Sequence, residues 1–180
     1  MKQKFIEYFM KVAELTASLS YAKRLKVGAV IVRDNRILSI GYNGTPSGWD
    51  NSCETEDAFG LKTKPEVIHA EQNAILKLAT SNESCEDSVL FLTHAPCTHC
   101  AKLIYQAKIK TVVYKYLYRD PEGINFLKKA GVEIRSLEKS SEPSLEETAT
   151  SNDGYNWTPL DTLLWNNNNF GDNNVHRQVG

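Results

Sequence analysis

The chain has 180 residues, of which 41% are hydrophobic and 24% charged, and its formal net charge is −1. This length fits one domain with a substantial core, and the near-zero charge gives no overall attraction to nucleic acid or to a membrane surface. No apolar run reaches the length of a membrane span, and the N-terminus lacks the apolar core of a signal peptide. Four cysteines, two of them closely spaced beside a histidine, indicate metal binding in a reducing compartment, so we expect a cytoplasmic protein.

The first part of the chain is expected to form a helix and a hairpin. Residues 3–19 carry apolar side chains at helical spacing and predict a packing helix. Two β-branched and apolar runs, at residues 27–32 and 36–42, are separated by a short polar segment. They predict an antiparallel hairpin at the entry of a sheet.

Three segments around this hairpin are candidates for ligand contacts. The polar stretch before it is either a solvated face or a phosphate-binding cluster, and its cations are Lys23, Arg24 and Lys26. Residues 41–48 contain three glycines and a proline, so they form either a structural loop or one that presents Asn43 and backbone amides to a ligand. Residues 49–66 are polar and irregular, and they predict a long loop over the same face.

The second half of the chain alternates helices with short strands. Its periodicity predicts helices at residues 67–79, 96–107 and 121–130, and strands at residues 89–93, 111–116 and 132–135. The complete order, α-β-β-α-β-α-β-α-β, predicts an α/β fold with three layers, α/β/α. Its central sheet should be mixed and five-stranded, mostly parallel with an antiparallel entry hairpin.

The composition changes after Leu137. Residues 138–153 are rich in serine, glutamate and threonine, which is typical of a flexible linker. They are followed by tryptophans and leucines between Trp157 and Trp165, and by a run of asparagines. We therefore expect one domain at residues 1–136 and a partly disordered tail at residues 137–180. The Trp/Leu segment of this tail could dock on the body or on a neighbouring subunit.

Two short motifs contain the residues that suggest chemistry. The first is His-Ala-Glu at residues 69–71, and the second is Pro-Cys-Thr-His-Cys at residues 96–100. Each motif opens a helix-like run, and the two cysteines are three residues apart, so they share one helix face. A histidine and two cysteines suit a tetrahedral zinc ion whose fourth position is open, and these ligands are His69, Cys97 and Cys100.

Glu71 decides between a catalytic and a structural zinc site. It lies two residues after His69, near the metal without needing to bind it. An open zinc position lowers the pKa of water, and a neighbouring carboxylate moves its protons. A structural site closes four ligands and needs no such carboxylate, so the pattern favours a catalytic zinc. Cys53 and Cys85 lack a recognisable ligand set for a second metal, and we interpret them as free thiols.

With these motifs the sequence resembles the deoxycytidylate (dCMP) deaminases of the zinc-dependent cytidine and deoxycytidylate deaminase superfamily, whose signature is His-x-Glu followed by Pro-Cys-x-x-Cys. The resemblance extends from about Phe5 to Arg135. It is carried by residues 26–32, 41–48, 69–75 and 96–104, and Gly-Tyr-Asn-Gly at residues 41–44 is typical of the dCMP branch. It implies the cytidine-deaminase-like fold and the hydrolysis of dCMP to dUMP and ammonia, which feeds thymidylate synthesis.

The resemblance also assigns roles to individual residues. The zinc ligands would be His69, Cys97 and Cys100, and the proton shuttle would be Glu71. The backbone amide of Ala70 and the side chain of Asn43 would hold the base and the sugar. A Tyr-Arg pair, Tyr118 and Arg119, would lie beside the substrate. His94 departs from the pattern, because relatives commonly have an apolar residue there.

Regulation is implied by the same resemblance. Related enzymes are often hexamers that dCTP activates together with Mg²⁺ and that dTTP inhibits, so we expect a homo-oligomer with a second nucleotide site. That site would use the loop around Asn43, including Gly44 and Thr45. Its triphosphate would bind the basic cluster, namely Lys23, Arg24 and Lys26.

Three other functions remain open at this point. The first is a deaminase of free cytidine or deoxycytidine. The second is a deaminase of tRNA or another polynucleotide, which should show a basic stripe; the balanced charge of the chain argues against it. The third is a zinc-stabilised interaction module without catalysis, against which Glu71 argues.

Overall fold

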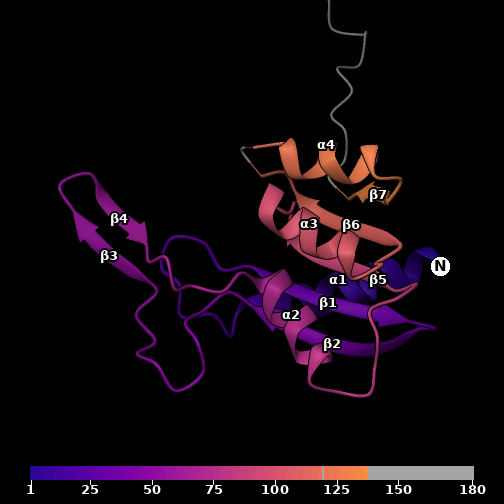
Figure 1. The fold of residues 1–180 in the computed structure, drawn as a ribbon, viewed down its shortest axis with the longest axis horizontal. Coiled ribbons are helices and arrows are strands. Elements are labelled where there is room, and N and C mark those ends of the chain that lie inside the picture. The colour runs from indigo at the N-terminus through magenta and orange to yellow at the C-terminus, as the bar shows by residue number, and fades with distance from the viewer. Residues whose placement is uncertain (119, 138–180) are drawn as a thin grey trace, which may run out of the picture. The chain divides into compact units, whose positions relative to one another are not determined.

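The computed structural model describes residues 1–118 and 120–137. Five strands form the main sheet in the order β2-β1-β5-β6-β7 (Figure 1). Their bounds are β1 Gly28–Arg33, β2 Arg36–Tyr42, β5 Val89–His94, β6 Thr111–Tyr116 and β7 Glu133–Ser136. The helices of this part of the chain are α1 Gln3–Ala17, α2 Ala70–Ala79, α3 Thr98–Gln106 and α4 Glu122–Lys129.

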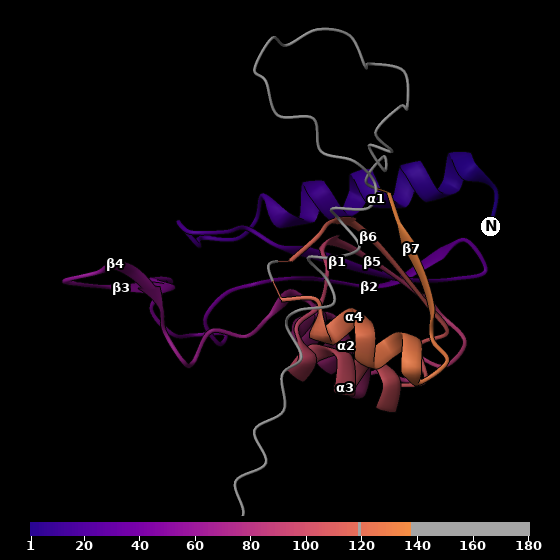
Figure 2. The same ribbon diagram turned by 90° about the horizontal axis from the view of Figure 1, so that it is seen from above.

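The helices cover both faces of the sheet, which confirms the predicted three layers. Figure 2 shows α1 on one face and α2, α3 and α4 on the other. Strand β1 is buried on both sides, and its residues alternate between the layers. Val30 and Val32 belong to the cluster that contains Phe9 of α1, whereas Ala29 and Ile31 pack with the other three helices.

The sheet is mixed, as predicted, but it is not mostly parallel. Strand β1 pairs antiparallel with both β2 and β5, and only the β5–β6 and β6–β7 pairings are parallel. The reason lies in the connection through α2. This crossover makes β2 and β5 parallel to each other, and β1 occupies the position between them, so it runs antiparallel to both neighbours.

The predicted entry hairpin is confirmed, and its turn explains its register. Asp34 and Asn35 have φ angles of 53° and 59°. Positive φ at both central residues is the hallmark of a type I′ turn, whose twist matches that of two antiparallel strands. Asparagine and aspartate adopt this conformation more readily than most other side chains.

Residues 49–66 are not wholly irregular, and this prediction was wrong. They contain a second hairpin, with β3 at Glu54–Asp57 and β4 at Gly60–Thr63, which extends beyond the main sheet in Figure 1. Among the described residues the two strands pair with each other alone, and apart from the buried Glu54 their side chains are exposed or half-buried, so they show no alternation of apolar and polar residues. The turn is made by Gly60 at a φ of 104°, and the carboxylate of Asp57 accepts a hydrogen bond from the amide of Phe59.

The predictions for the tail, for membrane-spanning helices and for the two other cysteines have different outcomes. The linker and the Trp/Leu segment predicted after residue 137 lie outside the described residues. Within residues 1–118 and 120–137, no helix has both the length and the apolar character needed to cross a membrane. Cys53 and Cys85 are buried and unpaired, as predicted, and burial raises the pKa of both thiols.

Candidate active site

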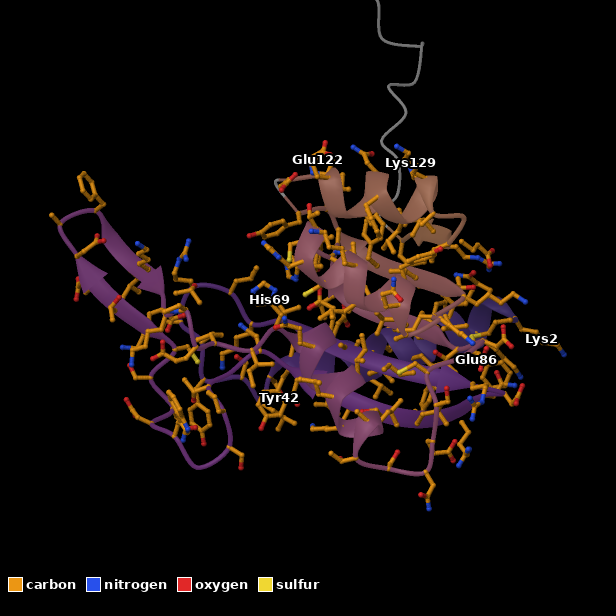
Figure 3. All side chains as sticks on the ribbon, in the orientation of Figure 1. Lys2, Tyr42, His69, Glu86, Glu122 and Lys129 are labelled. Atoms are coloured by element: carbon orange, nitrogen blue, oxygen red, sulfur yellow. The ribbon has the colours of Figure 1, made fainter. Side chains whose placement is uncertain are left out.

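The starts of two helices bring the predicted metal ligands together. His69 is the N-cap of α2, Cys97 is the N-cap of α3, and Cys100 lies in the first turn of α3. The Oε1 atom of Gln72 accepts a hydrogen bond from the amide of His69 and fixes the beginning of α2. In Figure 3, His69 lies between the helices and the loops that lead to the β3–β4 hairpin.

The three side chains are already spaced for a tetrahedral metal ion. The Nδ1 atom of His69 lies 3.6 Å from the Sγ atom of Cys97 and 3.4 Å from that of Cys100. All three ligand atoms lie within 4.8 Å of one another. Zinc bonds of normal length at a tetrahedral angle would separate nitrogen from sulfur by about 3.5 Å. The donor set and its spacing therefore fit zinc.

The protonation of this group favours binding of a cation. The pKa of the Cys97 thiol is lowered to about 3, chiefly by a hydrogen bond from Cys100 and then by one from His69. The pKa of Cys100 is raised, first by its hydrogen bond to Cys97 and then by burial. The positive ends of α2 and α3 also stabilise negative charge where they meet, so a thiolate at this position can bind a metal cation.

Glu71 is placed to handle protons rather than to bind the metal. It is the second residue of α2, it is only 4% exposed, and it is not a member of the metal-binding group. Its pKa is raised, mainly because burial disfavours the charged carboxylate. It lines the same cavity as His69 and Cys97, so a buried carboxyl group faces the space next to the metal ligands.

Two glycines allow the surrounding elements to approach the ligand-bearing turns. A Cβ atom on Gly41 of β2 would lie 2.2 Å from the carbonyl oxygen of Ala70. A Cβ atom on Gly123 of α4 would lie 1.9 Å from the carbonyl oxygen of Pro96. Strand β2 therefore supports the first turn of α2, and helix α4 supports the backbone before Cys97.

A cavity of about 320 Å³ connects the metal ligands with the β3–β4 hairpin. Its lining near the helix starts comprises His69, Ala70, Glu71, His94, Ala95, Cys97 and Tyr118. The rest of the lining comes from the segment before β1, from Asn43 and from the hairpin with its flanks, and includes Arg24, Leu25, Val27, Glu54, Thr63 and Val67. The cavity thus contains a proton-transfer group, a metal-binding group and one cationic side chain among the described residues.

The predicted substrate residues gather at this cavity, with one exception outside the described chain. Ala70, Tyr118 and Asn43 all line it, whereas Arg119 is not among the described residues. The Oδ1 atom of Asn43 accepts a hydrogen bond from the amide of Val27, and its Nδ2 atom donates one to the carbonyl of Leu25, both at 2.8 Å. Each of these two atoms can make one more hydrogen bond, so a contact of Asn43 with a substrate stays a prediction.

The residues predicted for a second nucleotide site are distributed differently. Arg24 lines the cavity that contains Glu71, whereas Lys23, Lys26 and Thr45 are absent from its lining. The amide of Gly44 donates to the carbonyl of Ile68 at 3.1 Å, and its carbonyl accepts from the amide of Ile68 at 2.9 Å. The backbone of Gly44 therefore holds the loop against the residue before His69, and a separate effector site stays a prediction.

Among the lining residues that were not predicted as site residues are His94, Glu54 and Thr63, whose side chains can form hydrogen bonds. His94 has its Nδ1 atom 3.1 Å from the Oγ1 atom of Thr93, and burial lowers its pKa. Glu54 and Thr63 belong to the hairpin that was missed, so nothing distinguished them from other residues of a polar loop. For His94 a signal existed, since it ends a buried apolar run and precedes the Pro-Cys-Thr-His-Cys motif by two residues.

Comparisons with known proteins agree with this site. Residues 3–116 match the family described as the cytidine and deoxycytidylate deaminase zinc-binding region. The deoxycytidylate deaminase of Saccharomyces cerevisiae is 37% identical over 153 residues, which cover 81% of this chain and 48% of that protein. The deoxycytidylate deaminase of Homo sapiens is 43% identical over 118 residues, which cover 60% of this chain and 62% of that protein.

A solved structure extends the similarity to the fold. The crystal structure of the dCMP deaminase from the cyanophage S-TIM5, in complex with dCMP and dUMP, has a TM-score of 0.73 and 48% sequence identity. The match covers 76% of this chain and 99% of the phage chain, whereas this chain spans about half the length of the yeast relative. From its matched region, its fold and its ligand group, the chain belongs to the cytidine and deoxycytidylate deaminase zinc-binding family.

Proposed function

We propose that this protein hydrolyses dCMP to dUMP and ammonia. The observation that supports this most directly is the buried Glu71, which lines one cavity with His69 and Cys97, and these two residues form a group with Cys100 that fits zinc. A structural zinc site would have no use for a carboxyl group at this position. The similarity to a phage dCMP deaminase solved with dCMP and dUMP supports the choice of substrate.

The residues of this chain account for the proton movements of the reaction. His69, Cys97 and Cys100 would hold zinc, which supplies Lewis acidity and lowers the pKa of a bound water molecule. The carboxylate of Glu71 would accept a proton from the attacking water and deliver it to N3 of cytosine, so that the water oxygen bonds to C4. The second water proton would then pass through Glu71 to the amino group at C4, and the C4–N bond would break to release ammonia.

Backbone and cationic groups would orient the substrate. The amide of Ala70 lies in the first turn of α2, where helix amides have no partner within the helix, so it can donate to the pyrimidine carbonyl. Arg24 is the only lysine or arginine among the described residues that line the cavity. A guanidinium group binds phosphate oxygens well, so Arg24 would bind the 5′-phosphate and favour a nucleotide over a nucleoside.

Arg24→Ala tests both the activity and the choice of substrate. Wild-type protein should release ammonia from dCMP much faster than from deoxycytidine. In the variant, kcat/KM for dCMP should fall by about 10–150-fold, the value of one hydrogen bond to a charged group, while kcat/KM for deoxycytidine should stay the same. Lys23→Ala is the matched control, because Lys23 is the cation next to Arg24 in the chain and does not line the cavity. A wild-type preference for deoxycytidine would support the nucleoside deaminase instead.

We further propose that dCTP with Mg²⁺ activates the enzyme, that dTTP inhibits it, and that its dUMP supplies thymidylate synthesis. The family resemblance motivates this proposal, together with an expected homo-oligomer such as a hexamer. One contact gives it a physical route. Gly44 is paired with Ile68, so a nucleotide that moved the loop at residues 43–45 would also act on the residue next to His69.

The regulation is tested by saturating the enzyme with dCMP in the presence of each effector. The half-saturating dCMP concentration should fall with dCTP and Mg²⁺ and rise with dTTP, by a factor in the usual allosteric range of about 5–150. Superimposable hyperbolic curves under all three conditions would show an unregulated enzyme. Sedimentation of the protein with and without the effectors would show whether its oligomeric state changes.

A further inference from the structure

The β3–β4 hairpin contacts both ends of Arg24. The Oε1 atom of Glu54, on β3, accepts hydrogen bonds from the amides of Lys23 at 3.0 Å and Arg24 at 3.2 Å. The Oγ1 atom of Thr63, on β4, accepts a hydrogen bond from the Nη1 atom of Arg24 at 2.9 Å. Glu54 and Thr63 are direct partners in the register of the hairpin. One cross-strand pair, the Glu54–Thr63 pair, therefore holds the backbone and the guanidinium group of the same residue.

The Glu54–Thr63 pair is anchored to the body of the protein. Glu54 is only 8% exposed, and a carboxylate buried to this degree needs hydrogen-bond partners, which the two amides provide. Next to it in the chain, Cys53 forms a small buried cluster with Ala22 and Val67. Through this cluster the hairpin packs against the segment that carries Arg24 and against the segment that leads to His69. The base of the hairpin therefore forms one wall of the cavity.

The arrangement has a consequence for substrate binding. An arginine side chain has many rotamers, and binding a phosphate restricts them at a cost in entropy. Arg24 is already restrained at its backbone and at one guanidinium nitrogen, so less freedom remains to be lost. A guanidinium has five donors, and among the described residues only Thr63 accepts from that of Arg24, which leaves donors for a phosphate.

We propose that Glu54 and Thr63 are positioning residues that hold Arg24 ready for the phosphate of the substrate. This inference rests on the proposed function, because it requires a phosphorylated substrate in this cavity. It gives the hairpin a role in selecting nucleotides over nucleosides. Neither residue needs to take part in the chemical step, so the effect should appear in KM and only for substrates that carry a phosphate.

Two variants remove the contacts separately. Glu54→Ala removes the acceptor of the two amides, and Thr63→Val removes the acceptor of the guanidinium group. We expect each to raise KM for dCMP by about tenfold, since displacing a binding group by even 1 Å is costly. The kcat for dCMP and the kcat/KM for deoxycytidine should both stay within about twofold of wild type, because the site around Glu71 is unaltered. The affinity for dUMP, measured by calorimetry, should fall by the same factor as KM rises.

Matched controls separate positioning from general damage to the fold. Glu54→Gln retains an oxygen that can accept both amide hydrogens, so it should keep a KM close to wild type. Glu56→Ala removes an exposed acid from the same strand that does not line the cavity, and it should change nothing. In an Arg24→Ala background, Glu54→Ala should cause no further rise in KM for dCMP, because the residue that it positions is gone.

The outcomes distinguish this inference from the proposed function. Equal losses on dCMP and deoxycytidine in Glu54→Ala and Thr63→Val, or no loss on either substrate, would overturn the positioning role. Should Glu54→Ala melt at a much lower temperature than wild type, the milder Thr63→Val decides the matter, because its only lost partner is the guanidinium group. If wild-type protein itself showed no preference for dCMP over deoxycytidine, the proposed function would fail before the positioning role was tested.

Discussion

Glu71→Gln should lower kcat for dCMP by at least about 10²-fold and leave zinc bound, because general acid–base catalysis is typically worth about 10²–10⁴-fold. The amide has nearly the shape of the carboxyl group, but it cannot accept a proton from water and deliver it to the base. None of the ligand atoms belongs to Glu71, so elemental analysis should find the same zinc content in the variant and in the wild type. Ammonia release at saturating dCMP gives the rate.

The stability of the same variant provides an independent control. Burial raises the pKa of Glu71, so in the metal-free protein this residue favours the folded state at low pH and loses that contribution as pH rises through its folded pKa. A neutral amide carries no such cost at higher pH. Metal-free Glu71→Gln should therefore melt at pH 8 no lower than the wild type. Near-normal turnover in this variant would remove Glu71 from the mechanism, whereas loss of zinc would assign it a structural role.

The metal group could be predicted from the sequence because its geometry is mostly local. A spacing of three residues places Cys97 and Cys100 on one face at the start of a helix, whatever the rest of the fold does. The starts of α2 and α3 lie close together because both helices pack on the same face of the sheet, as the predicted α/β layers allow. The close approach that Gly41 and Gly123 permit could not be predicted from the sequence, since it depends on backbone atoms of distant segments.

The wall of the cavity opposite the ligands could not be predicted in the same way. Lys23, Arg24 and Lys26 are equivalent in a sequence, and the structure singles out Arg24, which lines the cavity and donates a side-chain hydrogen bond to Thr63. These contacts depend on a hairpin whose strands have no apolar alternation, because they pack against no sheet. Periodicity detects burial, so a hairpin held by backbone pairing and a few polar contacts escapes it.

Asn43 shows why a loop composition is an uncertain guide to function. Its position in a glycine-rich loop suggested a side chain presented to a ligand. In the structure its side chain bonds to the backbone of Val27 and Leu25, which closes the chain just before β1. Loops that lack regular pairing need such side-chain partners for their backbone groups, and asparagine commonly provides them. A structural role and a substrate contact can coexist here, because each polar atom of Asn43 retains one free site.

Gly123→Ala should disturb the metal site, although Gly123 is not a metal ligand. Helix propensity alone predicts a gain of at most about 1 kcal/mol, because alanine is the better helix former and Gly123 is the second residue of α4. The added Cβ atom, however, would lie 1.9 Å from the carbonyl oxygen of Pro96 and 2.8 Å from the carbonyl carbon of Cys97. Both are backbone atoms, and a Cβ atom has no alternative rotamer, so α4 or the turn that carries Cys97 must move. Such overpacking typically costs about 1–3 kcal/mol, which exceeds the gain in helix propensity.

The displacement of α4 or of the turn that carries Cys97 should also lower the rate of deamination, because a shift of about 1 Å in a catalytic arrangement can cost about 10²-fold in rate. We therefore expect Gly123→Ala to unfold at lower urea concentration, to lose zinc to a chelator faster, and to turn over dCMP about 10²-fold more slowly. Asn125→Ala is the control in the same helix, since among the described residues its exposed side chain bonds only to Glu122, and its replacement should leave zinc binding and turnover intact. A Gly123→Ala protein more stable than wild type, with zinc retention unchanged, would show that α4 does not support the ligand-bearing turn.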